Sequence, residues 1–301
     1  MKKNIISAII IALFMLAGCV DPDSTTLDMA GMFCGSSPRV DQRFAESQAL
    51  NALSGFATVK AQSENYRIFV HADTHIMDSR DNLEHFIHEY RNALDCPLAL
   101  HLGDLVDAQN HWDYMKAAYS DIPQNPAKIG GDTLFMTLGN HDLFFGQWEQ
   151  YKNYWGSSAY YFIVETPSGK RDLFLILDSA EGTLGTDQMA WFKEVLNWSD
   201  TQDFRHKVVC THTHLFKSDG SQGHTSNFEL EETYEIMGLL AQHDVEMYWS
   251  AHDHSREEIT FNGVTYLVLD ALQEGSDPAG YMIATMGDDI GYRFVEMNFD
   301  H

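Results

Sequence analysis

The sequence predicts an α/β or α+β domain built around two sheets, and two observations lead to this prediction. From residue 66 onward, short apolar runs typical of buried strands alternate with segments whose apolar residues recur at helical spacing. After residue 254 the pattern changes to strand-like runs separated by tight turns. Alternating strands and helices favour a parallel sheet covered by helices, and consecutive hairpin strands add antiparallel pairs.

The expected elements follow one another in a regular order. In the alternating part, strands are expected at residues 67–72, 97–102, 133–138, 160–165, 173–177, 207–211 and 245–250. Helices are expected at residues 82–94, 186–196 and 230–243. Two hairpins complete the domain, one pairing residues 259–261 with 264–269 around the turn Asn262-Gly263, the other pairing residues 281–286 with 292–297.

The first residues have the features of a targeting segment. Lys2 and Lys3 precede an apolar stretch that is short for a membrane span, and Leu16-Ala17-Gly18-Cys19 follows. This order resembles a bacterial lipoprotein signal, which predicts cleavage after residue 18 and lipidation of Cys19. The alternative is an ordinary secretory signal in which Cys19 has no role. Either way we expect an exported protein, and a lipid anchor would hold it at a bacterial membrane, facing the periplasm or the cell surface.

The chain then divides into two expected regions. Residues 19–65 are weakly patterned and read as a tether and N-terminal extension, with a short helix near residues 45–59, and residues 66–301 form the main domain. Three further cysteines, Cys34, Cys96 and Cys210, leave the disulfide pairing open. Cys210 lies in an apolar run and reads as a buried small hydrophobic residue.

The charge balance excludes one class of partner. The chain has 19 Lys and Arg against 44 Asp and Glu, a net charge of −25. Such a surface repels polyanions, so general nucleic-acid binding is not expected. A small phosphate ester stays compatible with this charge because bound metal dications reverse the local field.

Five polar motifs end five different expected strands. They are Asp73-Thr-His75, Gly103-Asp104-Leu-Val-Asp107, Gly139-Asn140-His141-Asp142, Thr211-His212 and His252-Asp253-His254. Ligands of open α/β sheets gather beyond the carboxyl ends of the strands, so these motifs can converge on one site. Their carboxylate, amide and imidazole groups suit borderline divalent metals. The order and placement of all five therefore predict a shared metal site.

The ordered set resembles the calcineurin-like metallophosphoesterase superfamily over residues 66–270, in particular its cyclic-nucleotide-phosphodiesterase-like branch. The resemblance implies a four-layer α/β/β/α sandwich of two mixed sheets flanked by helices, with two metal ions at the sheet edge. Manganese, iron and zinc all fit such ligands. Ala251 stands where the family has Gly, and Asp107 stands where purple acid phosphatases need Tyr, which argues against a purple enzyme.

The resemblance also implies a role for each motif residue. Asp73, His75 and His254 would bind the first metal, Asp104 would bridge both, and Asn140, His212 and His252 would bind the second, with His214 as the alternative to His212. His141 would act as general acid beside the leaving group, and Asp107 would orient it.

The implied activity is hydrolysis of phosphate mono- or diesters by a metal-bridging hydroxide. The alternative is a catalytically inactive phosphoesterase fold that serves as a binding or surface protein.

The lipid anchor gives a first testable prediction. Cys19→Ser removes the thiol that receives the lipid, so the variant should stay unprocessed or leave the membrane fraction. Fractionation and N-terminal mass analysis of wild type and variant check this. A Cys19→Ser protein that is cleaved and sediments with membranes like wild type would contradict the prediction.

Overall fold

The structure, a computed structural model, describes residues 37–76, 81–106, 112, 133–215 and 228–297. The helices are α3 (Val40–Ser54), α4 (Asp81–Asn92), α6 (Trp148–Trp155), α7 (Gly185–Ser199), α8 (Leu230–Gln242) and the 3-10 helix η3 (His141–Gly146). The strands are β1 (Ala57–Lys60), β2 (Tyr66–His71), β3 (Leu98–His101), β4 (Thr133–Met136), β5 (Tyr160–Glu165), β6 (Arg171–Ile176), β7 (Phe204–Thr213), β8 (Met247–Ala251), β9 (Glu257–Phe261), β10 (Val264–Val268), β11 (Gly280–Met286) and β12 (Ile290–Glu296). Across these described ranges, no helix is both long and apolar enough to span a membrane.

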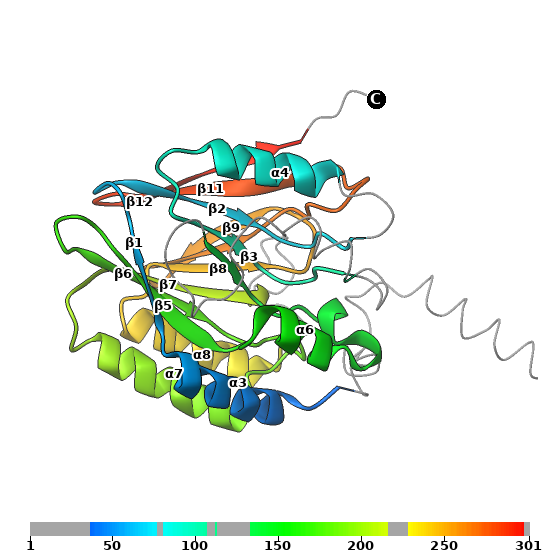
Figure 1. Cartoon of the computed structure of the whole chain (residues 1–301). Coiled ribbons are helices and arrows are strands. Elements are labelled where there is room, and N and C mark those ends of the chain that lie inside the picture. Colours follow the sequence, from blue (N-terminus) through cyan, green and yellow to red (C-terminus); the bar gives the residue numbers. More distant parts are fainter. Residues whose placement is uncertain (1–36, 77–80, 107–111, 113–132, 216–227, 298–301) are drawn as a thin grey trace, which may run out of the picture.

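The strands form two mixed sheets, which confirms the expected fold class. The seven-stranded sheet has the order β1-β5-β6-β7-β8-β10-β9, and the five-stranded sheet has the order β12-β11-β2-β3-β4. The two expected hairpins are present, since β9 pairs antiparallel with β10 and β11 with β12. Helix α4 covers the outer face of the smaller sheet, and α3, α7 and α8 lie against the larger one (Figure 1).

The sheets stack because their strands are apolar on both faces. In β2, Ile68 and Val70 point into the core between the sheets, where they meet residues of β3, β5 and β6, while Phe69 between them points toward α4. Successive side chains of a strand face opposite sides, so a continuous apolar run is what a doubly covered sheet requires. A third core lies between the larger sheet and the helices α7 and α8.

The N-terminal extension contributes a helix and a strand to these layers. Helix α3 begins at Val40 and ends before Gly55, whose φ of 72° favours glycine, so the expected helix lies earlier than residues 45–59. Strand β1 follows and pairs in parallel with β5, with Ala57 opposite Phe162. Residues 40–60 therefore extend the two-sheet sandwich. Cys96 and Cys210 are buried free thiols, and Cys34 lies outside the described residues.

A buried arginine joins α3 to the rest of the domain. The side chain of Arg43 has no exposed surface and donates two hydrogen bonds to the carboxylate of Asp178, at 2.8 and 2.9 Å, and one to Glu181 at 3.0 Å. Burial opposes the charge, but the two carboxylates more than compensate and raise the pKa of Arg43 above its usual value. The N-terminal helix is thus held by an ion pair from which water is excluded.

This network predicts a large loss of stability on Arg43→Met. The variant leaves the buried Asp178 carboxylate without a counter-charge and leaves Glu181 only the exposed Arg39, which should cost about 3–5 kcal/mol of unfolding free energy. Arg39→Met is the matched control, because Arg39 also pairs with Glu181 but its side chain is 74% exposed. The control should lose at most about 1 kcal/mol. Urea unfolding of the three proteins compares them, and equal losses in both variants would contradict the prediction.

Candidate metal centre

The five predicted motifs meet at one edge of the sandwich. Strands β2, β3 and β4 run parallel in one sheet, and β7 and β8 run parallel in the other, so their carboxyl ends carry the motifs to the same side. Backbone hydrogen bonds join the first two motif loops, from the N–H of Asp73 to the carbonyl of Gly103 (3.0 Å) and from the N–H of His75 to that of Asp104 (3.1 Å). The fold therefore fixes these loops relative to one another.

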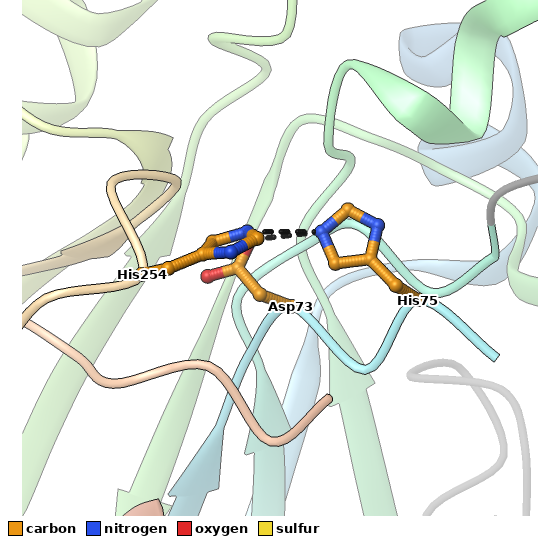
Figure 2. Close-up of side chains that lie close together, drawn as sticks. All are labelled: Asp73, His75 and His254. Atoms are coloured by element: carbon orange, nitrogen blue, oxygen red, sulfur yellow. Dashed lines mark hydrogen bonds and ion pairs between the residues drawn. The ribbon is translucent and has the colours of Figure 1, made fainter. Parts of the chain in front are cut away.

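A first cluster consists of Asp73, His75 and His254. The Nε2 atoms of the two histidines lie 3.0 Å apart, and each faces Asp73 Oδ1, at 3.9 Å from His75 and 3.6 Å from His254 (Figure 2). Asp73 Oδ1 is buried and accepts no hydrogen bond within the described part of the chain, whereas Oδ2 accepts the backbone N–H of His252 at 3.1 Å. Three potential ligand atoms thus converge on one point.

A second cluster consists of Asp104, Asn140, His212 and His252. Nε2 of His212 lies 2.9 Å from Asn140 Oδ1, 3.1 Å from His252 Nδ1 and 3.3 Å from Asp104 Oδ2. The other ring nitrogen of His212 donates to the carbonyl of Leu102 at 2.8 Å, which leaves Nε2 available as a ligand.

Asp104 connects the two clusters. Its Oδ2 also lies 3.6 Å from His75 Nε2, which belongs to the first cluster. The structure thereby brings together all seven residues for which metal binding was predicted.

The remaining predicted site residues divide into three cases. His141 lies beside the centre, with Nε2 4.0 Å from Asp104 Oδ2 and its ring edge-on to His75 at 4.5 Å between centroids. Its backbone N–H donates to Asp104 Oδ1 at 2.8 Å. His214 is placed next to His252, 6.0 Å between ring centroids, and takes no part in the second cluster. Asp107 and Cys19 lie outside the described residues.

The motif backbones are strained. Asp73, His75, Asp104, His252 and His254 all have positive φ, between 39° and 78°, a conformation that costs non-glycine residues energy. Two glycines make room for these turns. A Cβ on Gly103 would lie 2.6 Å from Nδ1 of His212, and one on Gly139 would lie 2.1 Å from the backbone nitrogen of Asp104. Strain concentrated in this way is typical of functional sites.

Ala251 stands where the resemblance implies glycine. It ends β8 and is fully buried among the residues between the two sheets, so its methyl group contributes to that core.

Two buried side chains that sequence reasoning left without a role shape these turns. The carboxylate of Asp142 accepts three backbone N–H groups, from Asp104 (3.1 Å), Leu105 (2.8 Å) and Gly139 (2.9 Å). Burial and the neighbouring Asp104 raise the pKa of Asp142 to about 7. The acid directly after Asn140-His141 was a sequence signal for this role.

The sequence contained no signal for the structural role of His101. Its Nδ1 accepts the N–H of Gly103 at 2.9 Å, and its Nε2 lies 3.1 Å from the hydroxyl of Thr74, which donates to the carbonyl of Leu105 at 3.0 Å. Burial lowers the pKa of His101 well below its usual value, so the ring is neutral, accepts at Nδ1 and donates at Nε2. This chain of hydrogen bonds ties the first motif to the second.

The buried carboxylates of the centre favour the binding of a cation. Burial opposes protonation of His212, yet the Asp104 carboxylate raises the pKa of His212 to about 9. Burial and the charge on His212 lower the pKa of His252 to about 3. A proton on His212 thus compensates the buried carboxylates, and a divalent cation between the same atoms would replace it. The donor set of two carboxylates, one amide and four imidazoles fits two borderline divalent ions.

Comparison with solved structures shows the same fold at low sequence identity. A dimetal phosphatase from Danio rerio is 14% identical, with 76% of this chain and 95% of that chain covered and a TM-score of 0.57. The anchor in the inner membrane complex of Plasmodium is 15% identical, with 77% and 84% covered and a TM-score of 0.55. A purple acid phosphatase from yellow lupin seeds is 14% identical, with 77% and 52% covered and a TM-score of 0.54.

Sequence comparison identifies the family. No curated protein matches the chain. The profile of the calcineurin-like phosphoesterases matches residues 66–256, which includes all five strand-end motifs and more than half of the chain. Motifs, fold and profile agree, and the chain belongs to the calcineurin-like phosphoesterase family.

Proposed function

We propose that the protein hydrolyses phosphate mono- or diesters at a pair of divalent metal ions. The observation that carries this proposal is the arrangement of two ligand clusters around one shared carboxylate, Asp104. Two-metal centres of this kind polarise a phosphoryl group and supply an activated water when the ions are bound.

The residues of the chain would hold and order this centre. Asp73, His75 and His254 would bind one ion, Asn140, His212 and His252 the other, and Asp104 both. Hydrogen bonds from backbone N–H groups fix both carboxylates, since His252 donates to Asp73 and His141 donates to Asp104. The ligand atoms are therefore preorganised, which lowers the cost of ordering them when ions and substrate bind.

The position of His141 supports its assignment as the general acid. Its side chain is 32% exposed, close to the 38% of the proposed ligand His254, so a substrate can reach it. The backbone of His141 is anchored to the shared carboxylate, which holds the ring next to the centre. A ring in this place can donate a proton to the departing oxygen.

The alternative function is a binding or surface protein without catalysis. The intact cluster and the strained motif backbones favour hydrolysis, because strain persists where surrounding structure and function require it. Hydrolysis of a generic chromogenic phosphate diester by metal-loaded protein separates the two functions.

Dependence on two metals is the first test. Chelation should abolish hydrolysis, and Asp104→Ala should lose both metal and activity because it removes the ligand that the two clusters share. Metal content by elemental analysis and rates with each of Mn, Fe and Zn check this. Asp288→Ala is the control, since Asp288 is 90% exposed in the turn after β11. Full activity after verified removal of the metal would disprove the proposal.

The role of His141 is the second test. His141→Ala should keep two metals but hydrolyse an alkyl ester about 10²–10⁴-fold more slowly, the usual loss for a general acid. A nitrophenyl ester should lose much less, because its leaving group departs without a proton. Rates on both esters and the metal content are measured together. Loss of a metal, or equal slowing on both esters, would show that His141 is a ligand or a packing residue instead.

A further inference from the structure

The loop that follows His141 carries two aromatic side chains, Phe144 and Phe145, that lead away from the metal centre. The rings form a continuous series: His75 to His141 at 4.5 Å between centroids, His141 to Phe144 at 4.3 Å, and Phe144 to Phe145 at 6.3 Å. Phe144 is partly buried, whereas Phe145 is 66% exposed. A series of aromatic rings therefore begins at the proposed ligand His75 and ends at an exposed phenylalanine.

Phe145 is held in an unfavourable backbone conformation. Its φ is 58° and its ψ 28°, a left-handed geometry that is rare for bulky residues. Within the described ranges, the seven other non-glycine residues with positive φ are aspartate, asparagine and histidine, and five of these seven belong to the ligand motifs. Aspartate and asparagine tolerate this conformation far better than phenylalanine does. Strain at an exposed aromatic residue that buries little surface points to a function for its position.

The chain on both sides of this aromatic pair is anchored, so its position is defined. Leu143 is fully buried, and its carbonyl accepts the hydroxyl of Ser37 at 2.7 Å. Gln147 is also fully buried and accepts the indole N–H of Trp112 at 2.6 Å. Phe144 therefore packs partly against the core, and Phe145 protrudes from a loop that is fixed at both ends.

We propose that Phe144 and Phe145 form a subsite for the leaving group, selective for alcohols that carry a flat ring. The inference rests on the proposed function, which places the departing oxygen beside His141. The part of the substrate attached to that oxygen would then extend over Phe144 toward Phe145. Two aromatic rings in contact gain stability beyond the area that they bury, and an alkyl chain does not obtain this gain.

Two esters with leaving groups of similar basicity test this selectivity. We would measure kcat/KM of metal-loaded protein for 2-phenylethyl and butyl phosphates, each as the monoester and the methyl diester. In Phe145→Ala the ratio of phenylethyl to butyl kcat/KM should fall about 2–10-fold, the range that one aromatic contact contributes. Phe145→Trp should retain the ratio.

Two further variants control for folding and for general surface effects. Phe145→Gly removes the ring and relieves the strained backbone, so its ratio should fall as in Phe145→Ala while its Tm is no lower than that of wild type. Leu94→Ala should leave the ratio unchanged, since Leu94 is 96% exposed after α4, at the edge where β3 begins and opposite the metal centre.

The outcomes separate this inference from the function on which it rests. An unchanged ratio in Phe145→Ala and Phe145→Gly, with the wild type active on butyl esters, would overturn the subsite and leave the phosphoesterase function standing. If Phe145→Ala slowed the hydrolysis of both esters by the same factor, the subsite would likewise be overturned and the phosphoesterase function would stand. A wild-type protein that hydrolyses neither ester with any of the three metals would overturn the function and the subsite together.

Discussion

Two carboxylates, Asp73 and Asp104, lie inside the protein with almost no exposed surface, and the rest of the centre is arranged around their charge. An ionised carboxylate loses several kcal/mol of hydration when it is buried, unless nearby groups replace the water. Here backbone N–H groups, imidazoles and, in the proposed function, two cations do so. The raised pKa of His212 beside Asp104 follows from the same requirement, whereas burial keeps His101 neutral.

The strained turns are a geometric consequence of that requirement. Ligand atoms from two sheets must reach one point, and ordinary extended backbone at the strand ends would direct successive side chains to opposite faces. Left-handed residues at the motif positions change these directions, and Gly103 and Gly139 allow the turns to approach closely. Asp142 stabilises the arrangement because its carboxylate binds the N–H groups of two turns at once.

The sequence predicted the fold and the convergence of the candidate ligands because both depend on local patterns. Apolar runs mark the strands, and parallel strands bring their carboxyl ends to one edge, so polar residues at those ends converge. The choice between His212 and His214 could not be made in this way, since residues two apart on a strand share a face. In the structure it is His212 that contacts Asn140 and the carbonyl of Leu102, which favours His212 as the candidate ligand.

The packing of the residues before 66 onto the domain could not be predicted from local sequence patterns either. The burial of Arg43 depends on Asp178, which lies 135 positions later in the chain, and no periodicity reveals such a partner. Strand β1 is only four residues long and alternates buried with exposed side chains, a pattern too short to separate from a loop.

Strand β1 also forms one edge of the larger sheet. It covers the backbone of β5, and its own outer edge is short and carries Lys60, which pairs with Glu165. Short, charged edges resist pairing with other chains, whereas a long apolar edge invites it. Without β1, the six residues of β5, with the sequence Tyr-Tyr-Phe-Ile-Val-Glu, would become that edge. A protein shortened to begin at residue 66 would therefore be prone to aggregate through β5, even with every candidate metal ligand in place.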